Sequence, residues 1–118
     1  TFGETFKSDG YNLDKVFSYK ILGLSLDDAF QKLRLEKPNY IKIDVDGIEH
    51  LIVSGGQEVL KTVEEILIEV DEKFLTQTTE VKKILLSYGF KLKSKNQSKM
   101  MQQASKENKT YNQIWKRK

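Results

Sequence analysis

The sequence predicts an α/β domain with a mostly parallel sheet that ends in an antiparallel hairpin. Apolar segments with strand character alternate along the 118 residues with segments whose apolar residues recur at helical spacing. The connections between them are short, which favours right-handed crossovers between parallel strands. Near the end, residues 90–93 and 111–115 read as two strands joined by a long polar loop, which indicates a hairpin.

The first elements are expected to be a strand, a helix and a central strand. Residues 17–24 have strand character. Ser25 is placed to cap the helix that follows, with Asp28 at its third position, and Pro38 is expected to end that helix after about three turns. Residues 40–45 form an apolar run that predicts the central, buried strand.

The remaining elements continue the alternation. Helical spacing resumes after Gly47 and is expected to be interrupted at Gly55 and Gly56. Residues 65–70 predict a second strong strand, and a further helix should end at Gly89, where a left-handed cap is wanted. One domain, spanning residues 1–118, accounts for all of these elements.

Composition and charge limit the classes of function. The chain has no cysteine, which excludes disulfides and thiolate metal sites, and no apolar run long enough to cross a bilayer. We therefore expect a cytoplasmic protein with no membrane partner. Residues 91–118 carry nine Lys or Arg and one acid, whereas residues 1–90 carry eleven and sixteen. The basic end could bind nucleic acid, but its lysines are dispersed among Ser, Gln and Asn, which favours a solvated face instead.

The candidate functional residues follow the central strand. Asp44, Asp46, Glu49 and His50 lie within seven residues of sequence. Ligands of open α/β sheets bind beyond the carboxyl ends of the strands, so acidic groups there face the mouth of a site. A solvated acidic turn is the structural alternative. These side chains would suit Mg²⁺ or Mn²⁺, but their spacing matches no metal motif, and we expect no metal.

Several segments together resemble a known family. They are Ser25-Leu26-Asp27-Asp28, residues 40–49 (Tyr-Ile-Lys-Ile-Asp-Val-Asp-Gly-Ile-Glu), the Gly55-Gly56 pair, residues 66–70 (Ile-Leu-Ile-Glu-Val) and residues 111–115 (Tyr-Asn-Gln-Ile-Trp). In order and spacing they resemble the FkbM family of S-adenosylmethionine-dependent methyltransferases. One departure is Asp46, where the family more often has Glu.

The resemblance implies a class I methyltransferase fold, which is Rossmann-like, with helices on both faces of the sheet and an antiparallel last strand. It also implies methyl transfer from S-adenosylmethionine, usually to a hydroxyl of a sugar or another small molecule. The family's acidic strand and glycine-rich turn have no counterpart here. We therefore expect the C-terminal portion of one methyltransferase domain, with the N-terminal strands missing and the fragment alone inactive.

The resemblance also implies roles for individual residues. Asp44 and Val45 would lie beside the cofactor, and Asp44, Asp46, Glu49 and His50 are the candidates for orienting the acceptor or taking its proton. His50 is included because an imidazole can act as a proton acceptor. Lys42 is expected to have a structural role, pointing to a sheet edge or pairing with Glu69 on the neighbouring strand.

Two alternatives come from other classes of protein. One is a non-catalytic half-domain that pairs with a partner, either the missing N-terminal half or a second copy, to cover an otherwise exposed apolar strand edge. The other is a nucleic-acid-binding module that uses the basic tail.

Overall fold

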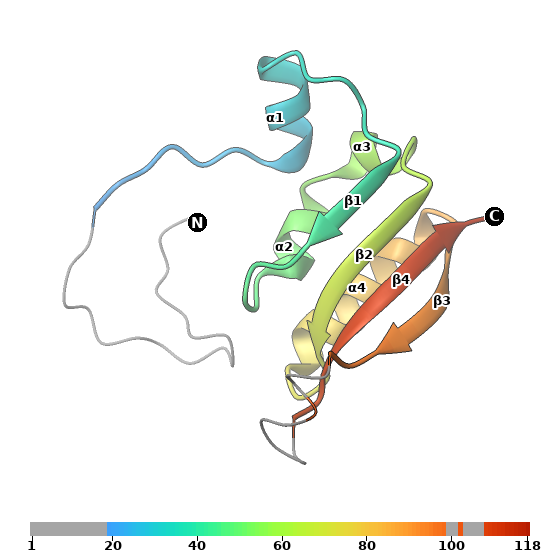
Figure 1. The fold of residues 1–118 in the computed structure, drawn as a ribbon. Helices are drawn as coiled ribbons and strands as arrows, with labels where there is room; N and C mark the ends of the chain where they lie inside the picture. The colour runs from blue at the N-terminus through green and yellow to red at the C-terminus, as the bar shows by residue number, and fades with distance from the viewer. Residues whose placement is uncertain (1–18, 99–101, 103–107) are drawn as a thin grey trace.

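The computed structural model describes residues 19–98, 102 and 108–118, and its elements form one sheet with helices packed against it (Figure 1). In chain order, the elements are α1 (Leu26–Lys32), β1 (Tyr40–Ile43), α2 (Glu49–Ser54), α3 (Gln57–Leu60), β2 (Glu65–Asp71), α4 (Leu75–Ser87), β3 (Phe90–Asn96) and β4 (Thr110–Arg117). Among the described residues, no helix is both long and apolar enough to span a bilayer.

The four described strands form a mixed sheet in the order β1-β2-β4-β3. β1 runs parallel to β2, whereas β4 runs antiparallel to both β2 and β3. The terminal hairpin is thus confirmed. β1, β2 and β3 therefore run in the same direction, and β4, inserted between β2 and β3, runs opposite to them. Because only one of the three described strand pairs is parallel, the expectation of a mostly parallel sheet stays a prediction.

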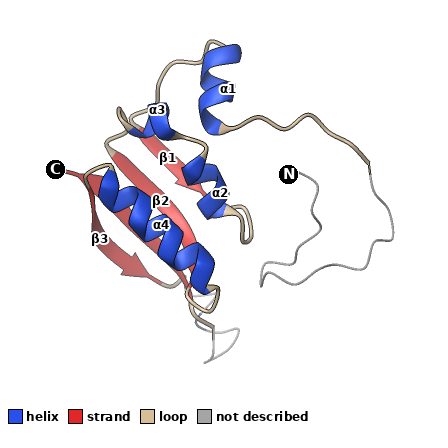
Figure 2. Ribbon diagram, turned by 180° about the vertical axis from the view of Figure 1, so that it is seen from behind, coloured by secondary structure: helices blue, strands red, loops and turns tan. Residues whose placement is uncertain are grey.

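The core lies between one face of the sheet and the helices α2, α3 and α4, which Figure 2 shows in front of the strands. Residues of β2 alternate between buried and half-buried, as expected for a strand with one packed face. Ile66, Ile68 and Val70 point into the core, where they meet Leu85 of α4 and Trp115 of β4. The opposite sheet face carries no described helix (Figure 1).

The helix breaks fall where glycine was expected to place them. Gly55 and Gly56 separate α2 from α3, and Gly89 follows α4 with a φ of +83°. A Cβ at Gly56 would lie only 2.7 Å from Leu26 Cδ2 of α1, so the second glycine lets α1 approach closely. Asp27 of α1 completes this contact, because its carboxylate accepts hydrogen bonds from the Glu58 and Val59 amides at the start of α3.

Two predictions about the first elements are wrong. Residues 19–24, the described part of the expected strand 17–24, form no strand, because they pair with none of the described strands, and they are mostly exposed. The Ser25 cap of α1 is confirmed, but the helix ends at Lys32, well before Pro38. Arg34 takes a left-handed φ of 52° and the Leu35 amide donates to the Phe30 carbonyl, which closes the helix in a Schellman-type turn without glycine.

Candidate functional site

The loop between β1 and α2 is shaped by Glu49, the first residue of α2. Asp46 and Gly47 both have positive φ values, 59° and 111°, so the chain reverses sharply after the strand. Glu49 is only 2% exposed, and its carboxylate reaches back over this turn. One oxygen accepts from the Val45 amide at 3.1 Å and the other from the Gly47 amide at 3.0 Å.

A second side chain, Gln77 of α4, joins this loop to the end of β2. Gln77 is 1% exposed; its amide nitrogen donates to Glu49 and its oxygen accepts from the Asp71 backbone amide at 2.8 Å. A buried polar side chain is costly unless it is hydrogen-bonded, and Gln77 is satisfied through both its donor and its acceptor. Loop, helix and strand end are therefore held together by one chain of hydrogen bonds.

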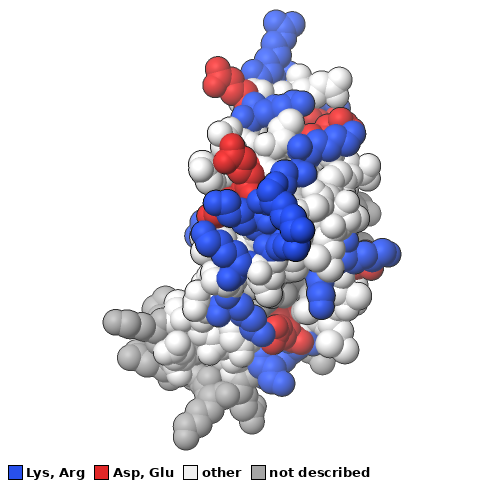
Figure 3. Space-filling model, turned by 90° about the vertical axis from the view of Figure 1, so that its right-hand side faces the viewer, with Lys and Arg blue, Asp and Glu red and all other residues white. Residues whose placement is uncertain are grey.

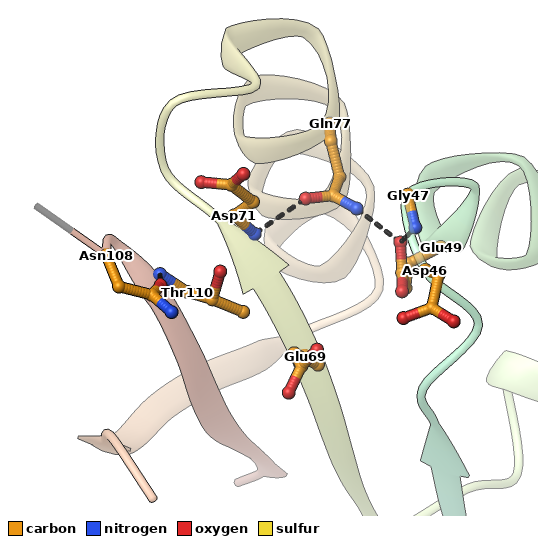
Figure 4. A pocket seen from close by; sticks show the side chains of 8 residues that line it. All are labelled: Asp46, Gly47, Glu49, Glu69, Asp71, Gln77, Asn108 and Thr110. Carbon is orange, nitrogen blue, oxygen red and sulfur yellow. Dashed lines mark hydrogen bonds between the residues drawn. The ribbon is translucent and has the colours of Figure 1, made fainter. Parts of the chain in front are cut away.

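These elements enclose a cavity of about 220 Å³ at the carboxyl ends of the two parallel strands (Figure 4). Its lining is polar and consists of Asp46, Gly47, Glu49, Glu69, Asp71, Gln77, Asn108 and Thr110. The first three come from the β1–α2 turn, Glu69 and Asp71 from β2, and Thr110 from the start of the antiparallel strand β4. The cavity therefore lies where open α/β sheets bind their ligands.

The electrostatics of the cavity are dominated by negative charge. Partial burial raises the pKa of Glu69, and the nearby carboxylates of Asp44, Glu49 and Asp46 raise it further; Lys42 only partly opposes them. Among the described residues, no Lys or Arg forms an ion pair with Asp46 or Glu69. A positively charged group in the cavity would therefore be favoured.

Lys42 does not pair with Glu69, as one reading of the sequence suggested. Its ammonium group lies 2.8 Å from the Asp44 carboxylate, two residues along the chain, and this contact raises the pKa of Lys42. In an extended strand, side chains at positions i and i+2 share a face, which explains why the local partner is reached. Glu69 contributes only a smaller, longer-range attraction.

Only some of the residues expected to form the site line the cavity. Asp46 and Glu49 line the cavity, whereas Asp44 is exposed in its ion pair with Lys42 and Val45 is 40% exposed. His50 does not line the cavity. Its ring packs edge-on against Phe74, with 5.6 Å between ring centroids, and its buried Nδ1 has no hydrogen-bond partner.

The end of the second strong strand predicts Glu69 and Asp71 at the rim of the pocket, and both do line the cavity. Three other lining residues were not found by sequence reasoning: Gln77 lies more than twenty residues after the acidic turn, and Asn108 and Thr110 about sixty. No local pattern signals a lone Gln inside an amphipathic helix, so only the packing of α4 on the sheet identifies Gln77. Within the described part of the chain, no three His, Asp or Glu side chains are arranged to hold a metal ion.

The comparisons place the chain among methyltransferases. The methyltransferase FkbM domain matches residues 8–92, which include β1, β2, the helices α1 to α4 and the β1–α2 turn. The chain therefore belongs to the FkbM methyltransferase family. Comparison with curated proteins and with solved structures gave no match. The expected likeness of residues 111–115 to the closing strand of the family lies outside the matched range and stays a prediction.

Proposed function

We propose that this chain is the C-terminal portion of an S-adenosylmethionine-dependent methyltransferase that acts on a hydroxyl group of a sugar or another small molecule. The single observation that carries the proposal is the cavity at the carboxyl ends of β1 and β2, whose acidic lining residues all lie within the segment that matches the FkbM domain. It is a site of suitable position and charge for a cationic ligand.

The chemistry of the cavity fits one end of the implied cofactor. S-adenosylmethionine carries a sulfonium and an ammonium group, and it supplies the methyl group when bound. Carboxylates that lack cationic partners, as Asp46 and Glu69 do among the described residues, would attract these positive charges. In this proposal the β1–α2 turn, with Asp44 and Val45, lies beside the cofactor.

The protein's own residues would act mainly by positioning. Holding reactants in alignment is the largest contribution such a site can make to methyl transfer. Asp46 is exposed and lines the cavity, so we assign it the acceptor side, where it would orient a hydroxyl and take its proton. Asp44, held by Lys42, and His50 remain candidates for the same task, whereas both Glu49 oxygens already accept backbone amides.

The described sheet also offers surfaces that further strands and helices of the same domain would cover. β1 pairs only with β2 among the described strands, and Tyr40 at its start is 68% exposed. An edge strand with apolar side chains is normally paired or protected. In the proposed enzyme, additional strands pair with β1 and complete the cofactor site; in the half-domain alternative, a partner protein does so.

Calorimetric titration with S-adenosylhomocysteine tests the proposal. We expect the complete product of the gene that encodes this chain to bind the ligand, and residues 1–118 alone to bind it much more weakly. Replacing Asp46 by Asn in the complete product should weaken binding of S-adenosylmethionine more than binding of S-adenosylhomocysteine, whose sulfur is neutral. The substitution removes the carboxylate that would attract the positive charge of the sulfonium. An absence of binding heat from the complete product would refute the methyltransferase proposal.

One observation favours a second candidate, a polyanion-binding surface at the β3 edge. Figure 3 shows Lys and Arg side chains gathered on the side of the molecule where β3 lies. Lys91 faces Lys116 across the β3–β4 pair, and the close ammonium group of Lys118 lowers the pKa of Lys91. An anion would relieve this repulsion. Lysines also protect edge strands from pairing with other chains, and this is the structural alternative.

Salt dependence separates the two readings of this surface. If three lysines contact phosphates, affinity for a fluorescent single-stranded oligonucleotide should fall about 20-fold between 50 and 200 mM salt. Replacing Lys91 and Lys116 by Gln should flatten that dependence, whereas replacing Lys83 on α4 should not. Affinity that is undetectable at low salt would leave edge protection as the role of these lysines.

A further inference from the structure

We propose that Glu49 and Gln77 form a positioning pair that holds the β1–α2 turn in the conformation presenting Asp46 to the cavity. This deepens the proposed function, since it assigns Glu49 a positioning role in that site instead of a role in proton transfer. The pair joins three elements that are far apart in sequence: α2, α4 and the end of β2.

The hydrogen bonds of Glu49 account for both of its carboxylate oxygens. One oxygen accepts from the Val45 amide, and the other accepts from the Gly47 amide and from the Gln77 side chain. A buried carboxylate is tolerated when several donors surround it. With 2% of its surface exposed and no oxygen free, Glu49 is placed to hold backbone and not to meet a substrate hydroxyl.

The turn needs such a restraint. Asp46 is a non-glycine residue at a φ of 59°, and Gly47 follows at 111°, which are conformations that a free loop populates poorly. The two amides held by Glu49 belong to the residues on either side of Asp46. Glu49 therefore fixes the turn around Asp46 without contacting its carboxylate, which is left to line the cavity (Figure 4).

Gln77 is suited to its place because an amide both donates and accepts. It donates to Glu49 and accepts from the Asp71 amide, so it transmits the position of the β2 end to the turn. A Glu at position 77 would put two carboxylates in contact, and a Leu would leave the Asp71 amide and one lone pair of Glu49 unpaired. Asp46 and Asp71, on opposite sides of the cavity, are thus held in a fixed relation.

Amide hydrogen exchange and chemical shifts, measured by NMR on the full chain without ligand, test the pair directly. In Gln77→Leu and in Glu49→Gln, we expect the Val45 and Gly47 amides to exchange about tenfold faster relative to the Ile68 amide of β2. Their amide protons should also shift upfield in Glu49→Gln, as a carboxylate acceptor is replaced by a weaker one. Val81→Ala is the matched control. Val81 is equally buried, one turn along α4, but takes no part in the hydrogen-bond chain.

The outcomes separate the pair from a general loss of stability. If Val81→Ala speeds exchange at Val45 and Gly47 as much as Gln77→Leu does, or if neither pair variant changes these amides, the positioning role is overturned. Titration of the complete gene product with S-adenosylhomocysteine adds the functional readout. We expect affinity to fall about tenfold in Gln77→Leu and less than twofold in Val81→Ala.

The proposed function can fail separately from the positioning pair. If the unmodified protein does not bind S-adenosylhomocysteine, the proposed function is refuted, and the amide measurements still decide whether Glu49 and Gln77 hold the turn. If it does bind, and Gln77→Leu releases the turn without weakening the ligand, the turn does not form the site and the inference is overturned.

Discussion

At each end of the sheet, one buried or partly buried acidic or basic side chain forms hydrogen bonds with several backbone groups. At the amino end of β2, the Arg117 guanidinium donates to the carbonyls of Val63, Tyr88 and Leu60 and lies 4.7 Å from the centroid of the Phe90 ring. At the carboxyl end, the Glu49 carboxylate accepts from two turn amides and from Gln77.

The difference lies in the charges that surround each side chain. The contacts that Arg117 makes at its end are with neutral carbonyls and an aromatic ring, so they bring no like charges together. Around Glu49, the carboxylates of Asp44, Asp46 and Glu69 crowd together and raise the pKa of Glu69. Unfavourable charge that is kept in one place is typical of a binding site and not of a structural joint. The comparison therefore supports the proposal that one end stabilises the fold and the other binds a ligand.

The largest effect is expected from removing the Arg117 joint. Arg117→Ala leaves three partly buried carbonyls without their donor, and we expect it to lower the free energy of unfolding by about 3 kcal/mol. Urea denaturation followed by circular dichroism measures the loss. Lys116→Ala, at the neighbouring exposed position, should change stability by less than about 0.5 kcal/mol. Equal losses in the two variants would show that the hydrogen bonds of Arg117 do not stabilise the fold.

An intermediate effect is expected at Asp27, which holds only two amides at a more exposed place. Asp27→Ala removes the acceptor of the Glu58 and Val59 amides and should cost about 1 kcal/mol. The midpoint of thermal unfolding is a sufficient measure. Asp28→Ala is the control, because the side chain of that neighbour contacts Lys32 and Ser25 but holds neither amide of α3. A larger loss of stability in Asp28→Ala than in Asp27→Ala would contradict the stabilising role given to the hydrogen bonds of Asp27.

The smallest effect, and the only stabilising one, is expected at Glu69. Its pKa is raised in the folded state, so its ionised form opposes folding above that pKa, and this cost disappears as the pH falls below the ordinary value of the group. Glu69→Gln should therefore stabilise the protein at pH 7 by a few tenths of a kcal/mol, about 0.5 at most. The gain should vanish near pH 4. A variant that is less stable at pH 7 would mean that Glu69 contributes to the fold.

Much of the secondary structure could be predicted because its causes are local. Ser25 caps α1, Gly55 and Gly56 separate α2 from α3, and Gly89 follows α4. Each of these assignments needs only propensities and spacing within about five residues. The early end of α1 was missed because Arg34 adopts the conformation for which glycine is the usual signal.

The sheet and the cavity depend on partners that are distant in sequence. A β-bulge between Leu92 and Ser94 places Lys95 on the opposite face from Lys91, although their spacing in a regular strand would put them on one face. The ion pair of Lys42 is the opposite case, because its partner Asp44 lies two residues along the chain and not on the neighbouring strand.

By itself, the sequence determined that an apolar strand ends in acidic residues and a glycine, and that this strand-turn-helix unit belongs to the FkbM methyltransferase family. Short-range sterics and periodicity are sufficient for that. Only the tertiary structure decided which carboxylate holds the turn and which one faces the cavity. Gln77 reaches Glu49 and the Asp71 amide only after α4 packs on the sheet. That packing follows from the burial of apolar surface, which does not depend on how far apart the partners lie in sequence.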